Sequence, residues 1–242
     1  MSTPRFYSHI EIPQCGIFRL PDAAAHHAAR VLRLEEGDEI VLFDGTGGES
    51  MCRIADVSKS CVLAEIVEKT AIDREAKLAV ILVQALAATE KMDWVLQKAV
   101  ELGVKCIQIV ETKRSVVKLS VERAKKREAH WNSVAISACE QCGRNRIPEI
   151  PPIVPLQAWL SVQRSGTKLL LSPSGKPLKA FPVPDSEIFL LVGPEGGLSP
   201  EEEALARARG FEALGLGPRI LRTETAGLAA LSALHAMWGD FN

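Results

Sequence analysis

The 242-residue chain lacks several features that would place it in a class at once. It has no run of about 18 uncharged apolar residues, so we expect no membrane-spanning helix. Its first residues, MSTPRFYSHIEIPQ, have no apolar segment of the signal-peptide kind, which predicts a cytoplasmic protein. No internal repeat or low-complexity segment occurs. With 47% hydrophobic and 24% charged residues, the composition is that of a soluble globular protein of one large or two small domains.

Metal-ligand pairs are also scarce. Among six cysteines only Cys139 and Cys142 form a CxxC pair, whereas a structural zinc site needs four ligands. The chain has neither a second such pair nor a pair of histidines nearby. We therefore interpret the two cysteines as neighbours one turn apart on a helix, and we expect no metal. Without an export signal, disulfides are not expected either.

The net charge of −1 is not that of a strongly basic nucleic-acid-binding protein, but the charge is unevenly distributed. Residues 1–70 hold seven Lys and Arg against eleven Asp and Glu, and residues 105–146 hold ten against four. A locally basic surface on a nearly neutral chain can bind a polyanion. The run ERAKKREAH within that segment is equally compatible with a solvated helix face.

The pattern of elements changes near residue 71. Before it, short β-branched runs such as DEIVLFDG and CVLAEIVEK, with the hairpin turn DGTGGES, predict a β-rich domain that a small barrel would close. The run DAAAHHAARVLRL predicts a short helix packed on those strands. The polar segment TAIDREAK marks the boundary. We therefore predict one domain over residues 1–71 and a second over residues 72–242.

The second domain alternates strands with helices, which predicts a parallel α/β sheet. Apolar runs predict strands at 78–86, 104–110, 168–172, 188–193 and 211–217. Helices are predicted at 89–103, 120–142, 199–210 and 223–239, the third beginning with a Ser199–Glu202 capping box. In the last helix, Leu228, Leu231, Leu234 and Met237 are expected to form the apolar side.

Ligands of parallel sheets bind beyond the carboxyl ends of the strands, which draws attention to three loops. These are the stretch after 168–172, the turn GPEGG at 193–197 and the segment GLGPRILRTETAG at 215–227. The glycine turn lacks the lysine of a P-loop and the spacing of a dinucleotide fingerprint. Its Glu195 would repel a phosphate. The turn is therefore suited to a neutral or cationic ligand, or is simply a tight turn.

Two further segments carry candidate functional groups. RTET at 222–225 precedes a helix, where it could be a polar helix start or a site. The segment SACEQCGRNRIPEI places five polar side chains at the end of the basic helix and in the turn after it. Arginines and amides of this kind can bind phosphates and base edges. These residues are Glu140, Gln141, Arg144, Asn145 and Arg146.

The segments ACEQCGRNRIPEI, LLVGPEGGLSPEE and LGPRILRTETA, in this order and spacing, resemble the RsmE family. These SPOUT-class methyltransferases modify N3 of a uridine in small-subunit ribosomal RNA. PRFY, HHAARVLRLEEGDEIVLFDG and EKMDWVLQKAVELGV are similar to the family pattern too, so the resemblance covers nearly the whole chain. It implies an N-terminal PUA-like β-barrel, a C-terminal SPOUT α/β domain with a deep trefoil knot, and a homodimer. Knotted chains are rare among proteins, so the knot is expected from the resemblance alone.

The resemblance also implies S-adenosylmethionine as cofactor and small-subunit ribosomal RNA, within the assembled subunit, as partner. A sulfonium cation is compatible with a carboxylate in the glycine turn. The implied cofactor contacts are Leu191, Gly193, Glu195, Gly196, Leu216, Leu221, Arg222, Thr223, Glu224 and Ala226. Candidate RNA-binding residues are Arg5, Arg30, Arg33, Gln141, Asn145 and Arg146.

Methylation of uridine N3 requires loss of a weakly acidic imide proton from an unpaired or extruded base. Either a general base near N3 or donors to the oxygens O2 and O4 can assist. Arg144 and Arg222 are candidate donors, and Glu140 and Glu224 are candidate bases; the sequence does not choose between these arrangements. Two other functions stay open. One is a ribosome-assembly factor with a vestigial cofactor pocket, and the other is a SPOUT methyltransferase acting on another RNA, such as transfer RNA.

Overall fold

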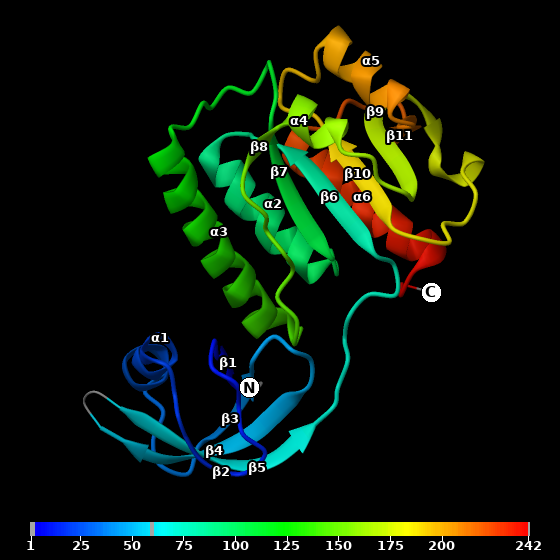
Figure 1. Cartoon of the computed structure of the whole chain (residues 1–242). Helices are drawn as coiled ribbons and strands as arrows, with labels where there is room; N and C mark the ends of the chain where they lie inside the picture. The colour runs from blue at the N-terminus through cyan, green and yellow to red at the C-terminus, as the bar shows by residue number, and fades with distance from the viewer. Residues whose placement is uncertain (1–2, 59–60, 242) are drawn as a thin grey trace. The chain divides into compact units, whose positions relative to one another are not determined.

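The computed structural model describes residues 3–58 and 61–241, which form two compact units (Figure 1). The first unit comprises Met1–Glu75 together with Ile136–Ile147, and the second comprises Ala76–Ala135 and Pro148–Asn242. The sequence predicted a boundary at residue 71, which assigns residues 136–147 to the second domain. In the structure these residues make their contacts mainly within the first unit. The end of helix α3 (Val121–Cys142) and the turn after it thus belong to the first unit.

The first unit is built on a five-stranded sheet in the order β1-β3-β4-β5-β2. Its strands are β1 (Arg5–Tyr7), β2 (Gly16–Arg19), β3 (Glu39–Phe43), β4 (Glu49–Val57) and β5 (Val62–Thr70). Only β1 and β3 pair in parallel. Alternate residues of the strands, such as Ile40, Leu42, Cys52 and Ile54, enter one core. The predicted hairpin between β3 and β4 is confirmed.

The predicted short helix of this unit has two parts. It begins as α1 (Asp22–His26) and continues as the π-helical turn η1 (His27–Leu32). Ala24, Ala25 and Ala28 are buried in the core of the sheet, as expected for a helix packed on it. The turn ends at Arg33, whose φ of 54° is left-handed. A non-glycine residue adopts this conformation only at a local cost, and it stops the helix.

The second unit contains a six-stranded parallel sheet in the order β11-β9-β10-β6-β7-β8, as predicted for the α/β domain (Figure 1). Its strands are β6 (Val80–Ala85), β7 (Cys106–Glu111), β8 (Val154–Pro155), β9 (Thr167–Pro177), β10 (Ile188–Val192) and β11 (Glu212–Gly215). Every residue of β6 and β10 is buried, because helices cover both faces of the central strands. Strand β9 extends five residues beyond the predicted 168–172.

Helices α2 (Thr89–Glu101) and α6 (Thr223–Trp238) pack on each other on one face of the sheet. The other face packs against α4 (Leu156–Ser161) and α5 (Pro200–Ala208), while a 3-10 turn, η2 (Leu178–Ala180), follows β9. One face of α2 is buried, and the predicted Ser199–Glu202 capping box of α5 is present. The buried residues of α2 are Met92, Val95, Leu96, Ala99 and Val100.

The predicted apolar side of α6 is partly wrong. Leu231 and Leu234 are buried, but Met237 is 41% exposed and Leu228 is only half-buried. The buried face instead includes Gly227 and Ala230. A Cβ at Gly227 would lie 3.4 Å from Val192 and 3.5 Å from Leu82. Small residues thus let α6 approach the sheet closely, which an apolar pattern of large side chains does not reveal.

Strands β9 and β11 meet at two glycines. A Cβ added to Gly175 would lie 2.4 Å from the carbonyl carbon of Leu214, and one added to Gly215 would lie 2.5 Å from the oxygen of Gly175. Any side chain would clash with backbone here, so the pair permits an approach that only glycine allows. This approach fixes the carboxyl ends of β9 and β11, where the main cavity lies. The trefoil knot stays a prediction.

Candidate functional site

A cavity of about 650 Å³ lies at the carboxyl ends of β9, β10 and β11. Its walls come from residues 170–173 within β9, residues 192–198 at the end of β10 and in the turn after it, and residues 214–223 from the end of β11 to the start of α6, with Lys91, Glu203 and Ala226. The structure therefore brings together the loops at 193–197 and 215–227 that the sequence singled out. The stretch after 168–172 is instead a continuation of β9, and of it only Pro173 lines the cavity. The volume lies in the range of small-molecule sites, and the walls combine leucine side chains with the glycine backbone.

The glycine turn after β10 is held in place by Arg114, from the loop after β7. Arg114 Nη1 donates hydrogen bonds to the carbonyl oxygens of Gly196 at 3.0 Å and Leu198 at 3.2 Å. Gly197 has a φ of +67°, and a Cβ at Gly193 would lie 3.2 Å from the nitrogen of Leu198. The turn is tight because both positions favour glycine. Nothing in the motif itself indicated Arg114, which lies far away in the sequence.

Glu195 in this turn is ion-paired. Its Oε1 accepts a hydrogen bond from Lys91 Nζ at 3.1 Å and lies 3.4 Å from the amide nitrogen of Ala88. Burial raises the pKa of Glu195, but hydrogen bonds from its own backbone N–H, Lys91 and Ala88 outweigh it and hold the pKa below its usual value. The hydrogen bond to Glu195 likewise raises the pKa of Lys91. Sequence reasoning missed Lys91, since it lies in helix α2.

Glu224 shares the same ammonium group. Its Oε2 lies 3.5 Å from Lys91 Nζ and makes no hydrogen bond among the described residues, and its side chain is 16% exposed. Oε1 lies 4.0 Å from Arg222 Nη1. Arg222 itself is 81% exposed along its side chain and lines the cavity. The wall therefore carries both charge signs, an arrangement suited to a zwitterionic ligand and unlike a phosphate cradle.

Thr223 links the start of α6 to the glycine turn and to strand β6. Its hydroxyl donates to the carbonyl oxygen of Gly193 at 2.6 Å and accepts from Gln84 Nε2 at 3.0 Å. Gln84 is fully buried at the end of β6 and also donates to Ala85 O. This chain of hydrogen bonds fixes the start of α6 against the glycine turn. Gln84 is a second residue that the sequence patterns did not indicate.

Most of the predicted cofactor residues line this cavity. Those that do are Gly193, Glu195, Gly196, Leu216, Leu221, Arg222, Thr223 and Ala226. Leu191 does not, because its side chain is buried in the core beneath the sheet surface with α4 and α5. Glu224 is not part of the lining either, and acts on it through Lys91.

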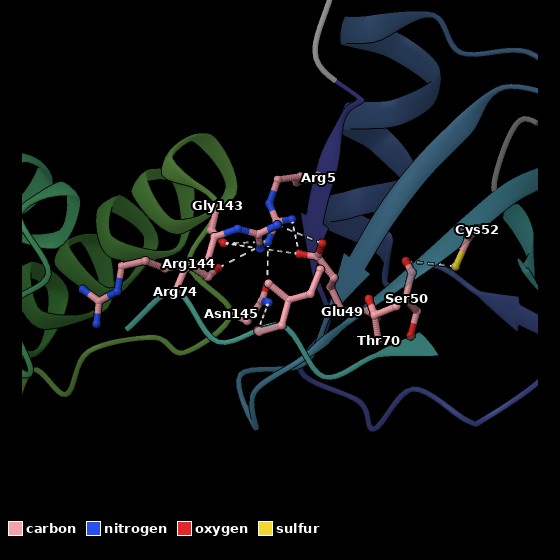
Figure 2. A network of polar contacts seen from close by, with 10 residues as sticks. Arg5, Glu49, Ser50, Cys52, Thr70, Arg74, Gly143, Arg144 and Asn145 are labelled. Atoms are coloured by element: carbon pink, nitrogen blue, oxygen red, sulfur yellow. Dashed lines mark hydrogen bonds and ion pairs between the residues drawn. The ribbon is translucent and has the colours of Figure 1, made fainter. Parts of the chain in front are cut away.

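The first unit contains a separate polar network centred on Glu49 (Figure 2). Arg5 Nη1 donates to Glu49 Oε2 at 2.6 Å, and Arg74 donates to both carboxylate oxygens at 2.7 and 3.1 Å. Arg5 also donates to Asn145 Oδ1 at 2.6 Å, and both arginines donate to Gly143 O. The hydrogen bonds from Arg74 and Arg5 lower the pKa of Glu49 to about 2, against the opposing effect of burial. The network fastens the turn after α3 to the sheet.

Arg144 and Asn145 are part of this internal structure. Arg144 is 4% exposed, and its Nε and Nη2 atoms donate to the carboxylate of Glu75. Asn145 is buried and donates to Ile72 O at 3.0 Å. Such contacts give both residues a role in holding the turn. A role as substrate donor, which the sequence indicated for Arg144, is less compatible with a buried, carboxylate-bound guanidinium.

Glu140 is half-buried, and its Oε1 accepts from the amide of Tyr7 at 2.9 Å. Burial raises the pKa of this carboxyl, although the Tyr7 hydrogen bond opposes the shift. The two candidate donors and two candidate bases are thus divided between the units: Arg144 and Glu140 belong to the first unit, and Arg222 and Glu224 belong to the second.

The remaining RNA-binding candidates differ in exposure. Arg30, Arg33, Gln141 and Arg146 are exposed, whereas Arg5 is engaged with Glu49 and lies 5.1 Å from the ring centre of Phe43. On the basic part of α3, Arg123, Lys125 and Lys126 are exposed. Arg127 instead donates to Thr89 Oγ1 at 2.7 Å, so it joins α3 to α2.

Cys139 and Cys142 both lie on α3, as predicted. Cys139 is buried, which raises its pKa to about 12, and its thiol donates towards Arg146 O at 3.6 Å. Among residues 3–58 and 61–241, no group of three or more His, Cys, Asp or Glu side chains is arranged to hold a metal ion. Over the same residues, no helix combines the length and the apolar character needed to cross a membrane.

Comparison with known proteins agrees with this arrangement. A family model described as "RNA methyltransferase domain" matches residues 74–235, and one described as "RNA methyltransferase PUA domain" matches residues 20–67. Together with the PUA-type first unit and the cavity of the parallel sheet, these matches define a two-domain RNA methyltransferase.

Curated relatives and a solved structure narrow the class. Ribosomal RNA small subunit methyltransferase E of Bacillus subtilis (strain 168) is 34% identical over 93% of this chain and 91% of its own length. That of Buchnera aphidicola subsp. Acyrthosiphon pisum (strain APS) is 32% identical over 98% and 95%. The crystal structure of ribosomal RNA small subunit methyltransferase E from Neisseria gonorrhoeae, bound to S-adenosyl methionine, superposes with a TM-score of 0.94 at 41% identity and covers both chains fully. The chain belongs to the ribosomal RNA small subunit methyltransferase E family, which confirms the resemblance drawn from its motifs.

Proposed function

We propose that this protein transfers a methyl group from S-adenosylmethionine to N3 of a uridine in small-subunit ribosomal RNA. The observation that carries the proposal is the cavity beyond β9, β10 and β11, where eight of the ten expected cofactor residues meet. The family membership and the cofactor named for the Neisseria structure support it.

The residues of the cavity fit this cofactor. The molecule has a flat neutral base, a sulfonium cation and an amino-acid end that carries both charges. Leu170, Leu214 and Leu216 offer apolar walls for a base, and the tight glycine turn exposes backbone polar groups. The Lys91–Glu195 pair and Arg222 provide charges of both signs. When bound, the cofactor supplies an electrophilic methyl group, and the protein positions it against the acceptor.

The acceptor nitrogen must lose its proton, and the charge then spreads to the neighbouring carbonyl oxygens. Arg222 is the donor we favour for those oxygens, because it is exposed at the cavity while its backbone caps α6. Glu140 and Glu224 remain the candidate bases. Burial raises the pKa of Glu140, which suits a base, and Glu224 lies 3.5 Å from Lys91, a residue that lines the cavity. Glu140→Gln and Glu224→Gln would separate them, since only loss of the base removes the acidic limb of the pH–rate profile.

We propose that four exposed side chains contact the RNA: Arg30, Arg33, Gln141 and Arg146. The hydrogen bonds of Arg5, Asn145 and Arg144 hold the turn that presents Gln141 and Arg146. We further propose that the protein acts as a cytoplasmic homodimer on the assembled small subunit. Sedimentation at several concentrations tests the dimer, and comparison of naked RNA with intact subunits as substrates tests the assembled form.

Calorimetric titration with S-adenosylmethionine tests the cofactor site first. We expect saturable binding that Gly193→Val abolishes while the protein stays folded, because a side chain there would enter the backbone of its own turn. Gly217→Ala is a matched control in the opposite wall, where a Cβ meets nothing within 4 Å. Binding without methyl transfer to any RNA would favour the assembly-factor alternative, and absence of binding would refute the proposal.

A further inference from the structure

A second, smaller cavity of about 110 Å³ lies at the opposite edge of the parallel sheet. Its walls include Val162–Arg164 and Lys168, at the start of β9, and Ala208–Phe211, just before β11. These are the amino ends of the strands, whereas the cavity proposed to bind the cofactor lies at their carboxyl ends. The second cavity is therefore separate from the cofactor site, although both belong to the second unit.

The floor of this cavity is formed by buried aromatic side chains. The ring centre of Trp159 lies 6.1 Å from that of Phe189 and 6.2 Å from that of Phe211. All three side chains are buried in the core between the sheet and helices α4 and α5. A low-polarity floor of this kind strengthens the interaction of any charges placed above it.

The rim carries three cations, Arg164, Lys168 and Arg209, and no carboxylate is among the residues that line the cavity. Arg164 lies 4.1 Å from the ring centre of Trp159, and its Nη1 donates to the carbonyl oxygens of Trp159 and Val162. Lys168 Nζ donates to Arg209 O at 2.9 Å. These bonds fix the side chains but leave further N–H groups of the guanidinium and ammonium available.

Cations nearby on the same elements behave differently. Arg207, two residues before Arg209 on α5, pairs with Glu203 at 2.7 Å, and Lys176 on β9 pairs with Glu212 at 3.0 Å. Within the described part of the chain, none of the three rim cations has an ion pair. Burial also lowers the pKa of Arg164, as expected for a cation that lacks a compensating anion.

We propose that this cavity binds a phosphate group, held by Arg164, Lys168 and Arg209. A guanidinium offers paired donors to phosphate oxygens and an ammonium offers a point charge, so the three together suit a compact, multiply charged anion. At about 30 Å³ per water molecule, the cavity holds only a few waters and is too small for a whole nucleotide. The phosphate can belong to an RNA backbone or be a free anion. The inference goes beyond methyl transfer, because the site lies away from the cofactor cavity.

The test compares the double variant Lys168→Ala/Arg209→Ala with the matched control Lys176→Ala/Arg207→Ala. Both change one residue of β9 and one at the end of α5, Arg207 in its last turn or Arg209 directly after it, but only the first pair lines the cavity. Circular dichroism, measured first, should be unchanged in both, and the Lys168→Ala/Arg209→Ala variant should keep its cofactor affinity, since neither residue lines the cofactor cavity. In the control, Arg207 pairs with Glu203, which lines that cavity, so cofactor affinity is measured there as a separate readout. If the unmodified protein does not bind the cofactor, the proposed function is contradicted, whereas the phosphate site is tested only by the two binding arms below. Failure of the function and failure of the phosphate site are therefore distinguishable.

One arm measures binding of a small-subunit ribosomal RNA fragment over a range of salt concentrations. If the phosphate belongs to RNA, the double variant binds several-fold more weakly, and its salt slope is smaller by about 0.7–0.9, as for one lost phosphate contact. The second arm titrates inorganic phosphate at constant ionic strength. Saturable binding that the double variant loses and the control keeps, with an unchanged RNA slope, identifies a free anion. If the double variant matches the control in both arms, the site is refuted.

Discussion

Lys91 Nζ lies 3.1 Å from Glu195 Oε1 and 3.5 Å from Glu224 Oε2, so one ammonium joins the glycine turn to the first turn of α6. The carboxylate in the turn is therefore ionised and fixed before any ligand arrives. Glu224 Oε1 also lies 4.0 Å from Arg222 Nη1, so two carboxylates and two cations lie together on this wall of the cavity. A carboxylate in the glycine turn attracts a sulfonium cation and repels a phosphate, which explains why this turn carries a glutamate.

Replacing Glu195 by Gln should weaken binding of S-adenosylmethionine more than binding of S-adenosylhomocysteine, which lacks the methyl group and with it the sulfonium charge. We expect roughly a tenfold loss for the charged ligand, equivalent to about 1.4 kcal/mol, and a smaller loss for the neutral thioether. Calorimetry with both ligands measures the difference. Glu203→Gln is the control, because Glu203 also lines the cavity but pairs with Arg207. Equal losses for both ligands would show that the carboxylate does not sense the sulfonium.

Arg222→Ala should lower single-turnover methyl transfer by about 10²–10³ when the variant is saturated with cofactor, as for loss of one donor to a developing oxyanion. The fold should persist, since Arg222 contributes its backbone oxygen, and not its side chain, to the cap of α6. Arg219→Ala is the comparison, because Arg219 is also exposed at the cavity. Full activity of the Arg222 variant would remove it from the reaction, and an equal effect at Arg219 would indicate a general charge effect.

Much of this arrangement follows from the sequence. Continuous apolar runs identify β6 and β10 because helices cover them on both faces, and Ser199 and Glu202 identify the start of α5 through local hydrogen bonds alone. The loops at 193–197 and 215–227 could be singled out because they follow strands of a parallel sheet, whose carboxyl ends share one edge.

The rest depends on contacts between residues far apart in the chain, which no local pattern contains. Lys91 and Glu195 are separated by 104 positions, and Arg114 and Gly196 by 82. A distant contact also explains why the prediction for Arg144 differs from the structure. Its position among polar residues indicated a surface donor, whereas pairing with Glu75 places it in the interior. The knot, likewise, depends on the path of the whole chain.

The Glu49 network predicts a pH dependence of the first unit. The pKa of Glu49 falls from 4.5 to about 2 on folding, so its stabilising effect is complete above pH 4.5 and is lost as the pH falls towards 2. The shift corresponds to at most about 3 kcal/mol. Hydrogen exchange of amides in β1 and β4, measured against pH, reports this unit. Tryptophan fluorescence would not, because all four tryptophans lie in the second unit.

Glu49→Gln should reduce protection of these amides at neutral pH and flatten the pH dependence between 4.5 and 2. Glu39→Gln provides the comparison in the same sheet, since Glu39 is about half exposed and lies 3.6 Å from Arg53. A pH dependence that survives unchanged in the Glu49 variant would mean that another group governs the acid limit.

The close approach of β9 and β11 predicts that Gly175→Ala is strongly destabilising. The new Cβ would stand 2.4–2.5 Å from backbone atoms of Leu214 and Gly215, which cannot move without displacing a wall of the cofactor cavity. We expect a lower midpoint of thermal unfolding and weaker cofactor binding. At Gly217, where only the φ of +93° opposes a side chain, alanine should cost about 1 kcal/mol. Comparable stability of the two variants would contradict the close approach of β9 and β11 at these glycines.

The most direct measurement is methylation of small ribosomal subunits that lack the modification, with the purified protein and S-adenosylmethionine labelled in its methyl group. The product RNA is digested to nucleosides, and liquid chromatography against standards, coupled to mass spectrometry, distinguishes 3-methyluridine from its isomers methylated on carbon or ribose. Primer extension then maps the position, because a methyl group on N3 blocks base pairing. We predict one methyl group per subunit, on N3 of a single uridine, with no transfer by Arg222→Ala above about 1% of the parent rate. Label in another RNA or at another atom, or no label despite tight cofactor binding, would contradict the proposed reaction.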